Sequence, residues 1–308
     1  MRMVQYGIWN NCSNQCEFCL IKDETFFPKE KMLSELERTI QNLDYIDWKN
    51  EFSRGISLLG GELYYITDKD LQNKFLELID AIIEKILKVS EDPLCRYSSV
   101  TNGLYDPTFL YQVIDRIKDA VGMRKIDINF SFDLKYRFKS DKDKQTVIDN
   151  INAFHKRYNY ILGIQMVLTQ YIIDAVLNGW KLSIFMNEIF PGNRLALLYP
   201  HPIFRGKYYG ETELKDFNFT RRSFLKFLPK LQEDLPFTYR GFIESTKNSA
   251  TFKHTGLFFK GDTGDEKQKP ILCDGKELLN PQCGHSILYQ CYSDTDKCML
   301  CDIVTMDG

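Results

Sequence analysis

The sequence predicts an α/β fold built on a parallel β-sheet. Short β-rich runs alternate with longer segments of helical period, and this alternation continues to about residue 200. Strands and helices that alternate in this way favour a parallel sheet with right-handed crossover connections. The chain of 308 residues, 44% of them apolar and 14% aromatic, can supply the core of one large α/β domain or of a barrel with a smaller appendage.

The predicted strands are short apolar runs, and the predicted helices are longer segments with an apolar stripe. We expect strands at Val4–Trp9, Gly55–Leu59, Tyr97–Thr101, Ile126–Phe132, Leu162–Leu168 and Leu195–Tyr199. We expect helices at Met32–Leu43, Asp70–Val89, Pro107–Val121, Gln145–Tyr158 and Ile172–Ile189. In the third helix Asp106 precedes Pro107, which is the pattern of an N-cap followed by proline at the first helical position.

The pattern changes after His201, where one more helix is expected at Arg221–Gln232. An amphipathic helix would pack Phe224, Leu225 and Leu228 inward. The alternative is that the aromatic and basic residues of Tyr208–Lys230 cradle a phosphate backbone or a peptide.

Short strand-like runs follow that helix, namely FTYRGFI at 237–243, GLFF at 256–259 and PILC at 270–273. We place a domain boundary near residue 210. Residues 1–210 are then the α/β domain, and residues 211–308 are a small cysteine-rich α+β extension. Small units of this kind commonly need a metal to hold them together.

Charge and hydropathy exclude several classes of protein. Lys and Arg number 40 and Asp and Glu number 42, so no overall basic excess points to nucleic acid, although a local basic groove leaves that partner open. The N-terminus lacks the apolar core of a signal peptide. The longest apolar stretch, Leu76–Val89, is charged and too short to span a bilayer. We therefore expect a cytoplasmic protein that does not enter the membrane.

Nine cysteines are distributed unevenly along the chain. Three fall within Cys12–Cys19, five fall within Cys273–Cys301, and Cys95 stands alone. Without an export signal, clustered cysteines suggest metal sites rather than disulfides. Cys95 begins an apolar run, so we expect it to be a buried thiol.

Cys12, Cys16 and Cys19 have the spacing C-x3-C-x2-C directly after the first predicted strand. Soft thiolates at this density suit an iron–sulfur cluster or zinc. A structural metal site is normally closed by a fourth protein ligand, whereas an open position admits something to be activated. No Cys or His lies between Cys19 and Cys95, which favours the open type. The alternatives are a zinc site with a distant fourth ligand and a chance cluster of cysteines.

This triad resembles the signature of the radical S-adenosylmethionine superfamily. The resemblance implies that Cys12, Cys16 and Cys19 are the catalytic ligands of a [4Fe–4S] cluster, whose fourth iron is chelated by S-adenosylmethionine. The reduced cluster then cleaves the cofactor to a 5′-deoxyadenosyl radical, which abstracts hydrogen from a substrate. An external one-electron reductant of the flavodoxin or ferredoxin type is implied as well. Phe18, before the last cysteine, fits the part of the family's loop that contacts adenine.

Two further motifs follow the second and third predicted strands. Gly60-Gly61-Glu62 combines glycines, which permit close backbone approach and unusual φ angles, with a carboxylate that can hold an ammonium group. It resembles the family's GGE motif, which binds the methionyl amine. Thr101-Asn102-Gly103 is a turn signal that the family often has at this place, so Asn102 joins the cofactor-binding residues.

Ser131-Phe132-Asp133 ends the fourth predicted strand, with Arg137 shortly after. This resembles the family's S-x-D segment, and implies that Ser131 bonds the ribose and that Arg137 meets the methionyl carboxylate. A solvated role for Arg137 and a cap or turn role for Asp133 stay open. Because loops at the C-terminal ends of parallel strands meet at one mouth, four motifs at four successive strand ends agree with one another. The resemblance covers about residues 4–200 and implies a partial, open (β/α)6 TIM-like barrel.

The C-terminal cysteines are similar in position and density to the SPASM or twitch extension of some family members. Asp274-Gly275 reads as a hairpin turn after Ile271-Leu272. The resemblance implies a second [4Fe–4S] cluster, with zinc as the alternative because Cys298-Met-Leu-Cys301 equally suits a zinc knuckle. His285 is a spare ligand candidate. The candidate metal ligands of this region are Cys273, Cys283, Cys291, Cys298 and Cys301.

The sequence thus predicts an enzyme that modifies a peptide or a small metabolite by radical chemistry. A nucleotide or nucleic-acid substrate is the alternative within this class. A zinc-stabilised binding module, with purely structural cysteines, is the alternative from a different class.

Overall fold

The computed structural model describes residues 3–14, 16, 19, 26–45, 55–93, 95–198, 203–204, 207–208, 215–217, 219–251, 256–259 and 271–272. The chain forms two compact units, each assembled from segments that are distant in sequence. The first consists of Met1–Gln15, Asp23–Phe130 and Thr255–Asp274, and the second of Cys16–Lys22, Ser131–His254 and Gly275–Gly308. The domain boundary at residue 210 stays a prediction.

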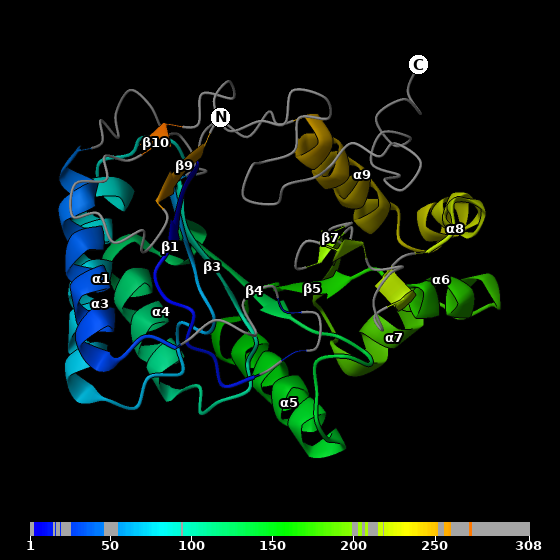
Figure 1. The fold of residues 1–308 in the computed structure, drawn as a ribbon, viewed down its shortest axis with the longest axis horizontal. Coiled ribbons are helices and arrows are strands. Elements are labelled where there is room, and N and C mark those ends of the chain that lie inside the picture. Colours follow the sequence, from blue (N-terminus) through cyan, green and yellow to red (C-terminus); the bar gives the residue numbers. More distant parts are fainter. Residues whose placement is uncertain are drawn as a thin grey trace. The chain divides into compact units, whose positions relative to one another are not determined.

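Six parallel strands with helices between them form an open α/β fold, as the sequence predicts (Figure 1). The part of the chain that the structure describes contains no closed barrel. Every one of these strands begins and ends within two residues of its predicted bounds. The strands are β1 (Met3–Gly7), β2 (Gly55–Leu59), β3 (Arg96–Thr101), β4 (Ile126–Ser131), β5 (Gly163–Val167) and β6 (Arg194–Leu198).

In the first unit, strands β1 to β4 lie side by side in the order of the sequence. Gly7 at the end of β1 is in register with Leu59 at the end of β2, and Thr101 at the end of β3 pairs with Phe130 of β4. The segments that follow β1, β2 and β3 therefore leave the sheet at the same edge. That edge is where parallel α/β sheets place their functional loops.

Three amphipathic helices accompany these strands. They are α1 (Lys29–Asn42), α3 (Lys69–Ile82) and α4 (Thr108–Val121). They lie beside one another on one side of β1 and β3 (Figure 1), with α3 packed between α1 and α4. On α3 the buried residues Phe75, Leu78, Ile79 and Ile82 recur at helical spacing, which explains why the sequence pattern predicts this helix.

Shorter helical turns complete the connections of the first unit. The predicted helix Asp70–Val89 changes from α to π geometry after Ile82, and the π-helix η2 covers Ile83–Leu87. The 3₁₀ turns are η1 (Leu43–Tyr45), after α1, and η3 (Met123–Lys125), directly before β4.

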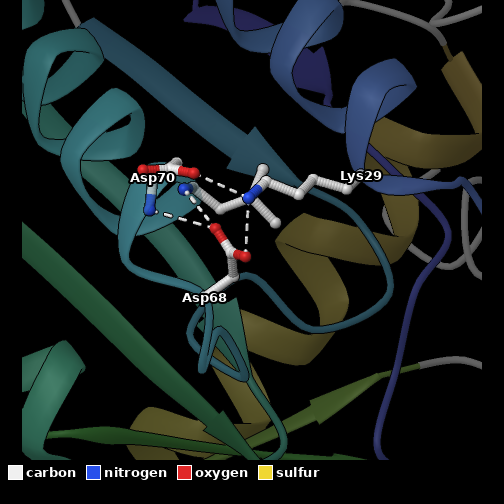
Figure 2. Close-up of polar contacts among 4 residues, drawn as sticks. Lys29, Asp68 and Asp70 are labelled. Atoms are coloured by element: carbon white, nitrogen blue, oxygen red, sulfur yellow. Dashed lines mark hydrogen bonds and ion pairs between the residues drawn. The ribbon is translucent and has the colours of Figure 1, made fainter.

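A pair of ionic contacts ties the start of α1 to the start of α3 (Figure 2). Lys29 Nζ lies 2.8 Å from Asp68 Oδ2 and 2.7 Å from Asp70 Oδ2. Asp68 is also the N-cap of α3, because its Oδ1 accepts hydrogen bonds from the backbone N–H groups of Asp70 and Leu71. Hydrogen bonding to Lys29 lowers the pKa of Asp68, and hydrogen bonding to Asp68 raises the pKa of Lys29.

This pair predicts a pH window for stability. The lowered pKa of Asp68 contributes stability that is present above its unfolded value of about 3.9 and is lost as the pH falls. The raised pKa of Lys29 contributes stability that is present below its unfolded value of about 10.4 and is lost as the pH rises. Asp68→Asn keeps the capping oxygen and removes the charge. We expect a slightly lower thermal midpoint for this variant between these two pH values, and no difference from the wild type near pH 2.

The effect is expected to be small because the side chains of Lys29 and Asp68 are each 38% exposed. Thermal unfolding of both proteins across the pH range measures it. Asp70→Asn is the control, since Asp70 is 72% exposed and its loss should shift the midpoint less. A difference that persists unchanged at pH 2 would contradict the ionic explanation.

Two strands from the distant C-terminal region join the first unit. Strand β9 (Gly256–Phe259) pairs in parallel with β1, and β10 (Ile271–Leu272) pairs antiparallel with β9. The run GLFF is therefore a strand, as predicted, and so is Ile271–Leu272 within the predicted run at 270–273; both extend the sheet beyond β1. The predicted hairpin at Asp274-Gly275 lies outside the described residues.

The second unit contains β5, β6 and helices that share apolar faces. Helix α8 (Arg221–Asp234) packs against α6 (Gln170–Leu177) and α9 (Pro236–Thr251), and α9 also packs against β6. Two short elements lie between β6 and α8 in the sequence. One is an antiparallel pair of strands, β7 (Ile203–Phe204) with β8 (Lys207–Tyr208), and the other is the 3₁₀ turn η5 (Lys215–Phe217). The helices are α5 (Asp141–Tyr158), α6 (Gln170–Leu177), α7 (Leu182–Ile189), α8 (Arg221–Asp234) and α9 (Pro236–Thr251).

Three sequence-based predictions for this unit are wrong in detail. The single helix predicted at Ile172–Ile189 is two helices, because Gly179 adopts a φ of 100° that ends the first of them. The run FTYRGFI at 237–243 is helix rather than strand, since it follows Pro236 at the first helical position and packs Phe242 into the core. On α8, Leu225 is 38% exposed, and Phe227 takes the buried position.

The sequence also predicts that no segment of the chain spans a membrane. Among the helices that the structure describes, none is both long and apolar enough to cross a membrane.

Candidate functional site

The candidate site begins where the chain leaves β1 and β2, and the two segments continue to pair beyond the strands. The Gly61 N–H donates to the Trp9 carbonyl at 2.9 Å, and the Glu62 N–H donates to the Asn11 carbonyl at 2.8 Å. The indole N–H of Trp9 donates back to the Glu62 carbonyl at 3.1 Å. The Gly-Gly-Glu motif therefore holds the three residues that immediately precede Cys12.

The two glycines are required by close approach of the backbone. A Cβ atom on Gly61 would lie 2.3 Å from the Asn11 carbonyl oxygen, and one on Gly60 would lie 2.8 Å from the Trp9 carbonyl oxygen. Neither glycine is among those with a positive φ. Of the two reasons that the sequence suggests for glycine here, close approach is confirmed and unusual φ is wrong.

This packing predicts the effect of Gly61→Ala. The added methyl group meets two backbone carbonyls that cannot rotate away, so strand β2 and the segment before Cys12 must separate. We expect a loss of about 1–3 kcal/mol in the free energy of unfolding, measured by urea denaturation. Gly7→Ala on β1 is the matched control, since nothing lies within 4 Å of its added Cβ. Equal losses in both variants would contradict this steric explanation.

Glu62 is a buried carboxylate that joins the end of β2 to the end of β3. Glu62 is 2% exposed, and the donors to its carboxylate oxygens include the following groups. The Thr101 hydroxyl lies 2.9 and 3.0 Å from the two oxygens, and the backbone N–H of Asn102 lies 2.7 Å from Oε2. The backbone N–H of Tyr64 donates to Oε1 at 3.1 Å. These contacts hold the end of β2 against the end of β3. A contact of Glu62 with the amine of a ligand stays a prediction.

Two sets of hydrogen-bonded, buried hydroxyl groups lie on residues that contact Glu62, and sequence reasoning missed them. Thr101 and Tyr105 are hydrogen-bonded at 2.5 Å, and the Tyr64 hydroxyl is hydrogen-bonded to Tyr97 at 2.9 Å and also to Ser99. Burial raises the pKa of Tyr97 to about 12, so it stays protonated at neutral pH. The signal was present in β3, because Tyr97, Ser99 and Thr101 alternate along the strand and share one face.

Asn102 connects this buried network to the first cysteine of the triad. Its side-chain amide Nδ2 lies 3.4 Å from Cys12 Sγ, and its Oδ1 accepts a hydrogen bond from the Leu104 N–H at 2.7 Å. The backbone N–H of Asn14 also points to Cys12 Sγ, at 3.4 Å. The first unit therefore gathers three of the predicted motifs, with Cys12, Glu62 and Asn102 linked by consecutive contacts.

Asn11 fixes the start of the cysteine loop against the residues that precede α1. Its Nδ2 donates to the Phe27 carbonyl at 2.9 Å, and its Oδ1 accepts from the Phe27 N–H at 2.8 Å. The Asn11 side chain thus bonds both backbone groups of Phe27, as a neighbouring strand would, and it holds the two residues side by side. Sequence reasoning missed Asn11, since an Asn in a loop carries no signal of its partner.

The second unit contains Cys16, Cys19 and the turn after β4. The Cys19 N–H donates to the Cys16 carbonyl at 3.1 Å, so the backbones of the two cysteines lie close together. Asp133 is 1% exposed and accepts hydrogen bonds from the N–H groups of Lys135 and Tyr136 at 2.8 and 2.5 Å. Asp133 is therefore the turn residue that the sequence left as one possibility.

Burial raises the pKa of Cys16 more than the nearby charge of Arg137 lowers it, and Cys19 and Asp133 raise it further. The positive charge of Arg137 thus acts on one of the predicted metal ligands. Ser131 is the last residue of β4 and is half-buried.

The side chains of the triad are of the type that holds an iron–sulfur cluster. Thiolates are the usual ligands of iron–sulfur clusters, and Cys12 Sγ already accepts N–H···S contacts of the kind that surround cluster sulfurs. The donor set therefore fits. Within the described ranges, however, no group of three or more His, Cys, Asp or Glu side chains is arranged to hold a metal ion. Cys12 belongs to the first unit, and Cys16 and Cys19 belong to the second.

Several predicted residues lie outside the described part of the chain. They are Phe18, His285 and the five C-terminal cysteines, Cys273, Cys283, Cys291, Cys298 and Cys301. Cys95 is described and fully buried, which confirms the expectation of a packed thiol.

The solved structures to which this chain is similar include the following two. SuiB of Streptococcus suis is 14% identical, with a TM-score of 0.49 over 87% of this chain and 62% of SuiB. A D-allulose 3-epimerase from Methylomonas sp., solved with D-allulose, is 10% identical, with a TM-score of 0.30 over 75% of this chain and 80% of the epimerase.

Both TM-scores lie below 0.5, and neither likeness is evidence for an activity of this chain. The chain spans less than two thirds of the length of SuiB. No protein-family model and no curated protein sequence matches the chain.

Proposed function

We propose that this chain is a radical S-adenosylmethionine enzyme. The observation that supports the proposal most is the set of contacts from Glu62 through Asn102 to Cys12. These three residues belong to motifs that follow three successive strands, and their contacts join the motifs within the first unit. The spacing of Cys12, Cys16 and Cys19 supports it further, because three thiolates leave one iron of a cubane cluster without a protein ligand.

In this proposal each residue has a defined part. Cys12, Cys16 and Cys19 hold the [4Fe–4S] cluster, which together with S-adenosylmethionine supplies a 5′-deoxyadenosyl radical. Burial keeps Cys16 protonated in the metal-free protein, so loading of the cluster releases a proton from this thiol. The network around Glu62 holds the backbone of Gly60–Glu62 in place.

Further cofactor contacts are proposed from the resemblance. The backbone after Gly60 would bind the methionyl amine, and Arg137 would bind the methionyl carboxylate, to which a guanidinium is well matched. Ser131 would bond the ribose, and Phe18 would contact the adenine. These residues exclude water and hold the cofactor, while the cofactor carries the chemistry.

The substrate class, the reductant and the second metal centre are also proposals. We keep a peptide or a small metabolite as the substrate, because the near balance of charges in the chain gives no general attraction to nucleic acid. A flavodoxin or ferredoxin would supply the electron. The C-terminal cysteines would hold a second [4Fe–4S] cluster.

Anaerobic purification and reconstitution test the proposed function. The protein should be brown, carry at least about four irons per chain, and form 5′-deoxyadenosine from S-adenosylmethionine under dithionite. A colourless protein that binds only zinc would instead favour the zinc-stabilised binding module. A brown protein that forms no 5′-deoxyadenosine would overturn the radical chemistry while keeping the cluster.

A further inference from the structure

Asn102 makes an unusual combination of contacts for a residue in a turn after a strand. Asn102 is 5% exposed, and its backbone N–H, its Oδ1 and its Nδ2 each have a hydrogen-bond partner. The backbone N–H is bonded to Glu62 Oε2 at 2.7 Å, Oδ1 accepts from the Leu104 N–H at 2.7 Å, and Nδ2 donates to Cys12 Sγ at 3.4 Å. The first two contacts fix the amide so that its donor side faces the sulfur.

The anchor behind Asn102 is rigid. Glu62 is buried and is also held by the Thr101 hydroxyl and the Tyr64 N–H, so it cannot shift without leaving polar groups unpaired. A donor held in this way is preorganised, and its strength does not depend on recruiting a mobile side chain.

A hydrogen bond to a thiolate sulfur stabilises negative charge on that sulfur. An iron–sulfur cluster gains one negative charge on reduction, so a donor to a ligating sulfur stabilises the reduced form more than the oxidised form. Hydrogen bonds to the sulfurs are one of the factors that set the reduction potential of such clusters.

We infer that Asn102 is a positioning residue that sets the reduction potential of the cluster held by Cys12, Cys16 and Cys19. This inference rests on the proposed function. Asn102 acts through the Cys12 sulfur and raises the potential, which makes the cluster easier for a one-electron donor to reduce. Glu62 and Leu104 hold the amide in the orientation that this requires.

Asn102→Leu and Asn102→Ala test this inference. Both variants remove the amide donor and keep the backbone N–H that bonds Glu62, but they differ in side-chain volume. The reconstituted full-length protein is titrated with dithionite against redox dyes, and the reduced cluster is followed by electron paramagnetic resonance. We expect the equilibrium constant for reduction to fall about tenfold in both variants, which is a potential lower by about 59 mV for a one-electron couple.

Ser13→Ala is the matched control. Ser13 is adjacent to Cys12, but its hydroxyl donates to the Leu104 carbonyl at 3.3 Å rather than to sulfur. We expect the potential of this variant to equal that of the wild type. A general loosening of the loop would instead change the potential of Ser13→Ala as much as that of the two Asn102 variants, and this result would overturn the inference.

The outcomes separate the inference from the proposed function. A wild-type protein that takes up no iron overturns the proposed function, and the inference with it. Wild-type and variant clusters with the same iron content and the same potential overturn the inference alone. If Asn102→Leu does not fold, the smaller Asn102→Ala decides between these outcomes.

Discussion

Replacing Cys12 by alanine is expected to abolish formation of 5′-deoxyadenosine, and we expect the same of Cys16→Ala and Cys19→Ala. Each change leaves two thiolates for a cluster in which three irons each need one, so we expect the variant to lose the cluster. The measurement is 5′-deoxyadenosine by liquid chromatography after incubation with S-adenosylmethionine and dithionite. Iron content and visible absorbance are recorded on the same samples.

Cys95→Ala is the matched control for these three variants. Cys95 is a buried cysteine far from the triad in sequence, and its substitution removes a thiol without removing a proposed ligand. We expect it to keep the iron content and the 5′-deoxyadenosine yield of the wild type, with a small loss of stability from the cavity. Continued 5′-deoxyadenosine formation by any of the three triad variants would falsify the role given to that cysteine.

Replacing Glu62 by alanine is expected to cause the largest loss of stability among the substitutions considered. The change removes the acceptor for the Thr101 hydroxyl and for the N–H groups of Tyr64 and Asn102 inside a buried region. Each donor left unpaired costs about 1–3 kcal/mol, so the free energy of unfolding should fall by about 3 kcal/mol or more. Urea denaturation measures the change.

Glu62→Gln separates the charge from the shape of this side chain. Its amide nitrogen would face a backbone N–H, so two donors oppose each other, and we expect a loss of about 1–3 kcal/mol. Glu84→Gln, on the exposed side of the π-helix, is the control and should have little effect. Equal stability of Glu62→Ala and the wild type would show that the network around Glu62 does not hold the strand ends.

The strands and most helices could be predicted because their signals are local. The runs at β1 to β6 are short and apolar, and the buried face of α3 repeats at helical spacing. The failures come from residues whose conformation depends on the rest of the fold. Gly179 divides a continuous apolar pattern by adopting a left-handed φ, and 237–243 is a helix that packs Phe242 into the core.

The candidate site could be predicted only in part, for a similar reason. The spacing of the cysteines and the positions of Gly60, Glu62 and Asn102 after strands are visible in the sequence. The partners of these residues are not visible, because Glu62 meets Thr101 and Asn11 meets Phe27 only after the strands have paired. The hydroxyl side chains of β3 could have been noticed, since they alternate on one face of the strand.

The central claim is that three thiolates hold a cluster whose fourth iron is free to bind S-adenosylmethionine. Electron paramagnetic resonance of the reduced cluster, recorded before and after addition of S-adenosylmethionine, tests it most directly. We expect a clear change in the cluster signal on addition of the cofactor, and no cluster signal in Cys12→Ala. A cluster signal that S-adenosylmethionine leaves unchanged would mean that no iron is open to the cofactor, and the proposed site would then be wrong.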